Sequence, residues 1–140
     1  MTIDYFLKNY QAGNCFFSIR REDITERVKG LDWKSYYVYL LCIDGEIVYV
    51  GYSGVIRERI KLHRRHICFD TVYIAEVENS QNIEDINDIL ELENEIINFT
   101  NPILNQSEKF TMYEKYNKDG AKPLGFILGY IECMSKFGIV

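Results

Sequence analysis

The chain has 140 residues, of which 47% are hydrophobic, 14% aromatic and 26% charged, and its formal net charge is -5. This length and composition predict one domain over residues 1–140 and exclude a mainly disordered chain. The negative charge argues against a protein that coats nucleic acid without selectivity, because such binding grows with the number of phosphates neutralised by Lys and Arg.

We expect no membrane or export signal at either end of the sequence. The most apolar segment, Leu124 to Val140, is interrupted by Glu132 and Lys136, so we expect no membrane-spanning helix and no membrane partner. Asp4 stands where a secretory signal would be basic, and we expect a cytoplasmic protein. With 18 Ile and three Ala, the composition suits an AT-rich coding sequence, such as that of a phage or a low-GC bacterium.

The four cysteines lack the spacing of a zinc site, and we interpret them as reduced thiols in the core. They stand at Cys15, Cys42, Cys68 and Cys133.

The first 35 residues are predicted to hold one or two short helices, the better one at 23–29. Two segments rich in aromatic and β-branched residues then follow, at 36–43 and 46–52, joined by Asp44 and Gly45. Asp-Gly between two such segments is a strong signal for a hairpin turn. The pattern therefore predicts an antiparallel hairpin.

The apolar period changes after the hairpin. Ile56, Ile60, His63 and Ile67 form an amphipathic helical stripe, with Ser53 as its expected cap. Residues 70–77 are predicted to form a third strand. A second helix is predicted over 82–99, where Asn101-Pro102 stops it.

Residues 108–122 are polar, and 124–137 have helical apolar spacing. Either flank, 1–35 or 106–140, is expected to cover the sheet or to form a dimer surface. The fold class predicted is α/β (α+β), with a small, mostly antiparallel three-stranded sheet flanked by helices.

Glu93 is a lone carboxylate on a helical stripe of Ile86, Leu90 and Ile97, with Ile89 and Ile96 beside it. An unpaired buried carboxylate costs several kcal/mol, roughly 3 or more, unless it is neutralised, paired or bound to metal. The residue is therefore either functional, or it pairs with Arg59 or His63, or it reaches solvent.

The helix at 56–67 carries a local positive charge on an acidic chain. Its bases within 51–66 are Arg57, Arg59, Lys61, Arg64 and Arg65, against one acid, Glu58. Arg59 and His63 lie one turn apart and can face one ligand together. The pattern indicates a phosphate site, and the alternative is an ordinary solvated face with a structural histidine.

The hairpin carries tyrosines that could pack or react. Tyr37 and Tyr39 share one face, whereas the face of Tyr49 depends on the hairpin register. A phenol beside a cation can transfer protons, because positive neighbours lower its pKa from its usual value near 10.

Together these residues resemble the GIY-YIG endonuclease family. Tyr37-Val38-Tyr39 and Tyr49-Val50-Gly51 stand for its two tripeptides, and Tyr49 comes ten positions after Tyr39. Arg59 comes eight residues after Gly51, His63 four further on, and Glu93 nine before Pro102 and twelve before Asn105, which is the family's spacing. Tyr37 departs from the usual Gly, and Tyr52 replaces a Lys found in some members. The match covers residues 36–105, the expected nuclease core.

The resemblance implies a metal-dependent DNA endonuclease. Glu93 would hold one Mg2+ or Mn2+, Tyr49 would act as base with Tyr39 positioning the water, and Arg59 would stabilise the phosphate charge. His63 would contact the phosphate or assist proton transfer, and Asn105 and Gly51 would order the site. The expected DNA-binding residues are Tyr52, Arg57, Lys61, Arg64 and Arg65.

By the same resemblance, the products would carry a 5'-phosphate and a 3'-hydroxyl. A monomer would nick DNA, and a homodimer would make double-strand breaks. The alternative function is a catalytically weak nucleic-acid-binding or regulatory module on the same fold, which would keep its affinity without Glu93. A purely structural domain is a third interpretation.

Overall fold

A computed structural model describes residues 1–32, 34–67, 69–77, 87–102 and 104–106. Its α-helices are α1 (Ile3–Asn9), α2 (Ile24–Arg27), α3 (Ile56–His66) and α4 (Asn87–Thr100), and its strands are β1 (Phe17–Arg20), β2 (Tyr37–Ile43), β3 (Glu46–Ser53) and β4 (Thr71–Glu76). Short 3-10 helices occupy Gly13–Cys15, Arg21–Asp23, Val28–Gly30 and Leu104–Gln106. The molecule is thus a mixed α+β fold.

The four strands form one antiparallel sheet in the order β1-β4-β2-β3. The expectation of three strands was wrong, because Phe17–Arg20 adds a strand to the edge of β4. In β1 the apolar residues Phe17 and Ile19 alternate with Ser18 and Arg20 over only four residues, so the sequence pattern is short, and only Ile19 is buried. Strand β2 is central and is buried along its whole length.

The predicted hairpin is confirmed. Asp44 and Gly45 both have positive φ, 48° and 79°, as a two-residue turn matching the twist of the strands requires. The register pairs Ile43 with Glu46 and Tyr37 with Ser53.

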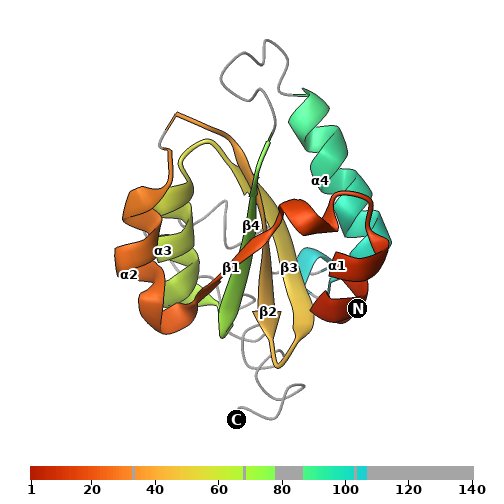
Figure 1. Ribbon diagram of the computed structural model, residues 1–140, viewed down its shortest axis with the longest axis horizontal. Helices are drawn as coiled ribbons and strands as arrows, with labels where there is room; N and C mark the ends of the chain where they lie inside the picture. The colour runs from red at the N-terminus through yellow and green to blue at the C-terminus, as the bar shows by residue number, and fades with distance from the viewer. Residues whose placement is uncertain (33, 68, 78–86, 103, 107–140) are drawn as a thin grey trace.

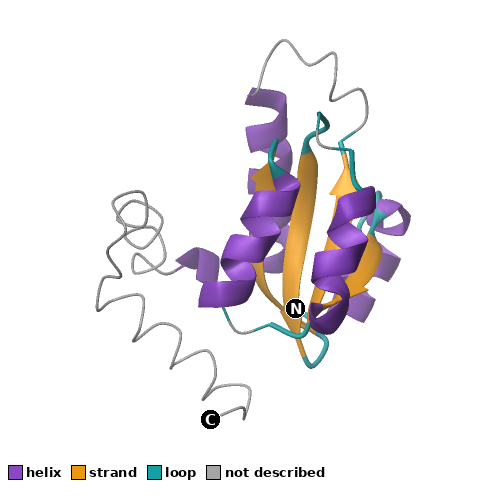
Figure 2. Ribbon diagram, turned by 90° about the vertical axis from the view of Figure 1, so that its left-hand side faces the viewer, coloured by secondary structure: helices purple, strands orange, loops and turns teal. Residues whose placement is uncertain are grey.

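Two cores lie on opposite faces of the sheet (Figure 1). On one face, α2 and α3 pack on the odd-numbered residues of β2, and Figure 2 shows these two helices in front of the strands. On the other face, α1 and α4 cover the even-numbered residues, with Phe6 and Ile96 at the centre. The N-terminal flank therefore covers the sheet, which is one of the two arrangements expected for it.

Helix α3 begins after Val55, and Ser53 is not its cap. The Ser53 hydroxyl accepts a hydrogen bond from the Val55 N–H at 2.9 Å, so it shapes the turn before the helix. Of the helix predicted over 82–99, the structure describes α4, and residues 82–86 lie outside the described residues. The helix ends at Thr100 because Asn101 takes a positive φ of 50° before Pro102. The segments 108–122 and 124–137 lie outside the described residues.

Of the cysteines, Cys42 is a buried free thiol, as expected, whereas Cys15 is exposed and the core interpretation was wrong for it. Burial raises the pKa of the Cys42 thiol. Cys68 and Cys133 lie outside the described residues. Within the described part of the chain, no helix has the length and apolar character needed to cross a bilayer.

Candidate functional site

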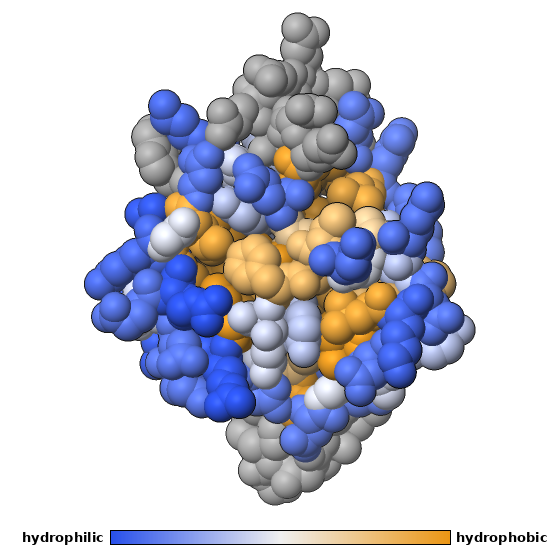
Figure 3. All heavy atoms as spheres, in the orientation of Figure 1, coloured by the Kyte–Doolittle hydropathy of each residue, from blue (hydrophilic) through white to orange (hydrophobic). Residues whose placement is uncertain are grey.

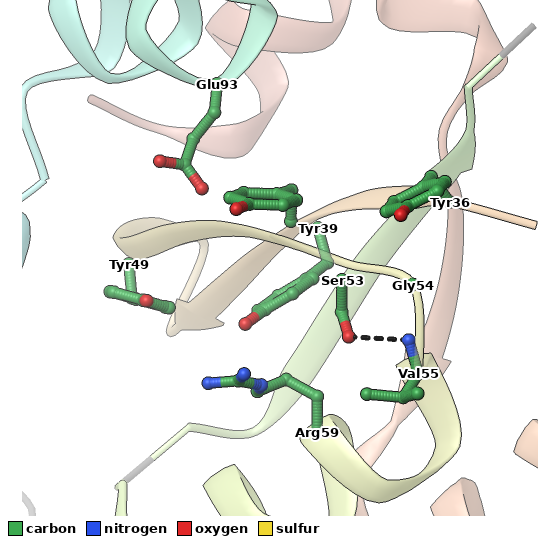
Figure 4. A pocket seen from close by; sticks show the side chains of 9 residues that line it. Tyr36, Tyr39, Tyr49, Ser53, Gly54, Val55, Arg59 and Glu93 are labelled. Atoms are coloured by element: carbon green, nitrogen blue, oxygen red, sulfur yellow. Dashed lines mark hydrogen bonds between the residues drawn. The ribbon is translucent and has the colours of Figure 1, made fainter. Parts of the chain in front are cut away.

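A pocket of about 490 Å³ opens beside β3, an edge strand of the sheet. It is lined by Tyr36, Tyr39, Tyr49, Tyr52, Ser53, Gly54, Val55, Arg59 and Glu93. Figure 4 shows Arg59 entering from α3, Glu93 from α4, and Tyr39 and Tyr49 from β2 and β3, all around one space. Four of the five expected catalytic residues therefore line a single pocket.

A β-bulge decides on which face Tyr49 lies. Tyr49 pairs with Leu41 and Ile47 pairs with Cys42, so Val48 has no partner of its own in the ladder. The extra residue brings Val48 and Tyr49 into the same core as Tyr39. The two tyrosine rings lie 6.1 Å apart between centroids.

Gly51 allows the Tyr39 ring to lie across the strand. Gly51 is the register partner of Tyr39, and a Cβ at this position would be 2.5 Å from the Tyr39 hydroxyl oxygen and 3.0 Å from the Tyr49 ring. A side chain here would force Tyr39 or the strand to shift, so this position favours glycine. Gly51 thus supports the site through the space it leaves for Tyr39.

His63 lies behind the tyrosines rather than in the pocket. Its Nε2 and the Tyr39 hydroxyl are 2.7 Å apart in a buried hydrogen bond, and its side chain is 1% exposed. The Tyr49 ring packs on it edge-on, with centroids 5.2 Å apart. Two roles were expected for His63. Its side chain is too buried to touch a phosphate, but its bond to Tyr39 would allow it to assist proton transfer.

Glu93 lies on the buried line of α4 but is itself only partly buried. Ile89, Ile96 and Thr100 are buried at helical spacing, and Glu93 stands between Ile89 and Ile96. Its carboxylate opens into the cavity that it shares with Arg59 (Figure 4). The sequence left open whether Glu93 faces a cation or reaches solvent. In the structure both hold, because the carboxylate shares an open pocket with Arg59.

Because α3 and α4 cover opposite faces of the sheet, Arg59 and Glu93 reach the pocket from either side of the β3 edge. Neither face alone could place both groups.

Asn105 holds the edge of β3 from the 3-10 helix at 104–106. Its side-chain Oδ1 accepts from the Val50 N–H at 2.7 Å, and its Nδ2 donates to the Val50 carbonyl at 2.8 Å. Val50 lies between Tyr49 and Gly51, so the amide fixes the backbone that carries the site. This geometry suits the ordering role expected for Asn105.

The expected DNA-binding residues separate into three groups. Tyr52 lines the pocket. Arg57 donates to the carbonyls of Lys29 and Leu31 at 2.9 and 2.8 Å, so its guanidinium anchors the chain before β2. Lys61, Arg64 and Arg65 lie in a different hollow, described below.

Sequence reasoning did not single out Tyr36 or Gly54, which also line the pocket. A Cβ on Gly54 would lie 2.9 Å from the Tyr36 ring, so this glycine, like Gly51, leaves space for an aromatic side chain. The run Gly-Tyr-Ser-Gly at 51–54 was the available signal.

The residues present suit one hard divalent cation. Mg2+ is commonly held by one or two carboxylates while keeping several waters, and Glu93 offers one carboxylate in a pocket with room for them. Within the described ranges, no three side chains of His, Cys, Asp or Glu gather as a metal cluster. Any metal held here would therefore depend on Glu93, water and the substrate.

Comparison with known proteins returned no matching family model, no matching curated protein and no matching solved structure.

Proposed function

We propose that the chain is a metal-dependent DNA endonuclease of the GIY-YIG type. The observation that carries the proposal is the convergence of Tyr39, Tyr49, Arg59 and Glu93 on one pocket. These residues are spread over 55 positions and four elements, and the spacing in the sequence selects them independently of the fold. A solvated basic face or a structural histidine would not require that convergence.

The pocket offers a cation for the scissile phosphate. The Arg59 guanidinium is charged at every relevant pH and forks toward phosphate oxygens, so it stabilises the charge that develops during displacement. A bound Mg2+ or Mn2+ would add charge neutralisation at the same oxygens, and Glu93 is the residue that would hold it.

The two strand tyrosines handle the attacking water. Tyr49 acts as the general base and takes up the proton of the attacking water, a role that uses the phenolate form of its side chain. The Tyr39 hydroxyl donates to His63 in the tautomer that leaves Nε2 unprotonated, and its oxygen lone pairs then orient the water. The water attacks phosphorus, and the 3'-oxygen leaves and takes a proton from solvent, which gives 5'-phosphate and 3'-hydroxyl ends.

The proposal is tested with supercoiled plasmid incubated with the purified protein in Mg2+ or Mn2+, with EDTA as control. We expect open circles from a monomer, or linear DNA from a homodimer, and no product with EDTA. Glu93→Gln keeps the size of the side chain and should abolish cutting. Glu91→Gln makes the same change at an exposed position of α4 and should cut like the wild type.

Equal cutting by Glu93→Gln and wild type would contradict the proposal, because the product would then come from another nuclease or another site. Plasmid, phage and genomic DNA that are bound but left intact under both metals would instead support the binding-module alternative.

A further inference from the structure

A second hollow, of about 460 Å³, lies on the opposite side of α3 from the pocket. It is lined by Arg21, Thr25, Lys61, Arg64 and Arg65. Four of the five side chains are cationic and none is acidic. In Figure 3 the most hydrophilic side chains gather over this side of the molecule, where α2 and α3 lie in Figure 1.

Helix α3 therefore presents bases in two directions. Arg59 faces the pocket, and Arg64 follows five residues later, which is about 140° around the helix and about 7.5 Å along it. Successive phosphates of one DNA strand advance about 3.4 Å along the duplex axis. The two hollows are thus spaced on the scale of a few nucleotides.

Arg21 builds one wall of the hollow. Its guanidinium donates to the carbonyls of Ile67 and Phe69 at 3.1 Å and to that of Arg64, and it stacks on the Phe69 ring at 4.8 Å. Two of these carbonyls belong to the end of α3, where the helix dipole favours a cation. Arg21 already places a cation at the end of α3, so the other bases of the hollow are not needed to stabilise the helix end.

Arg64 is fixed across the hollow, since its guanidinium donates to the Thr25 hydroxyl at 2.9 Å. Lys61 and Arg65 are exposed, and neither forms an ion pair with a carboxylate of any described residue. Lys61 lies one turn before both arginines, so the three charges face one ligand. Like charges held together without acids repel one another, and a polyanion would relieve this repulsion.

We propose that this hollow binds a backbone phosphate of the nucleic acid, a few nucleotides from the phosphate that is cut. The inference rests on the proposed function, since it assigns a second contact with the same substrate. Arg64, held by Thr25, offers a preorganised fork, and Lys61 and Arg65 add charge at its rim.

The test measures DNA affinity at several salt concentrations, in EDTA and on the Glu93→Gln chain so that the DNA stays intact. The probe is a fluorescent duplex taken from a fragment that the wild type cuts. Lys61→Ala and Lys61→Ala/Arg65→Ala are compared with Lys8→Ala, which removes one exposed charge from α1 on the other face of the sheet. Thermal melting of each variant confirms that it is folded.

Each lost phosphate contact should make the slope of log K against log salt shallower by about 0.9. We therefore expect a loss of about 0.9 for Lys61→Ala if one phosphate is released, a further loss for the double variant, and none for Lys8→Ala. An unchanged slope in the double variant, with DNA bound and cut by the wild type, would overturn the inference alone. Failure of the wild type to bind or cut any DNA would overturn it together with the proposed function.

Discussion

Tyr39 lies across Gly51 so closely that a methyl group on the glycine would be 2.5 Å from the tyrosine hydroxyl. Tyr39 is 1% exposed and bonded to His63, so it cannot move aside without loss of packing. The glycine of the second tripeptide therefore has a steric role within the sheet.

Gly51→Ala should destabilise the protein by about 1–3 kcal/mol, the usual cost of overpacking a core, and should impair cleavage because Tyr39 and Tyr49 are displaced. Urea denaturation and plasmid cutting measure the two effects. Gly30→Ala is the matched control, since a Cβ there would have no heavy atom within 4 Å. Equal stability of the two variants would show that the ring accommodates a methyl group.

Tyr39→Phe removes the hydroxyl that bonds His63 and leaves a buried ring nitrogen without that partner. We expect a loss of about 1–3 kcal/mol in stability, together with slower cutting and an altered pH profile. Tyr37→Phe is the control on the same strand, because its hydroxyl accepts from the Asp32 N–H at 2.9 Å and lies outside the pocket lining. It should lose stability without a change in the pH profile of cutting, and a shared change in both profiles would argue against a role for the Tyr39–His63 bond.

Asn105→Ala removes two hydrogen bonds to the Val50 backbone, and each such bond contributes about 0.5–1.5 kcal/mol. Amide hydrogen exchange should accelerate at Val50, and cutting should weaken as β3 loosens. Asn9→Ala provides the comparison, since the Asn9 side chain on α1 donates one exposed bond, to the Tyr5 carbonyl. Protection at Val50 that survives Asn105→Ala would mean that the edge is held by other contacts.

Tyr10 makes the free energy of unfolding depend on pH in the alkaline range. Burial, and then the charge and hydrogen bond of Glu95, raise the pKa of Tyr10 from 10 to about 12. The folded phenol keeps its proton to higher pH than the unfolded one, so its contribution is complete below pH 10 and is lost as pH rises from 10 to 12.

The wild type should therefore be more stable than Tyr10→Phe by a larger free energy of unfolding at pH 9 than at pH 12. Tyr5→Phe, at an exposed phenol of α1, the helix that ends just before Tyr10, controls for the loss of one hydroxyl. A difference that does not change with pH would contradict the prediction.

The sequence predicted α3 and α4 from the period of their apolar residues, and the hairpin and β4 from their aromatic and β-branched residues, with Asp44-Gly45 as the turn signal of the hairpin. It did not predict β1, whose apolar alternation covers only four residues and whose place in the sheet comes from pairing with β4. For the site, spacing selected the residues, but the bulge at Val48 sets the face of Tyr49 and the depth of His63 emerges only from packing. The sequence also could not distinguish basic residues with different environments, since Arg57 is hydrogen-bonded to the Lys29 carbonyl whereas Lys61 is exposed.

Arg59 depends on the packing of Ile60 against one face of the sheet, and Glu93 on that of Ile96 against the other. Each half of the site thus has its own apolar support. Partial unfolding of either face is enough to separate the two groups, even while the remaining sheet persists. Heat should therefore inactivate the protein at a lower temperature than the one at which most of its circular dichroism signal is lost.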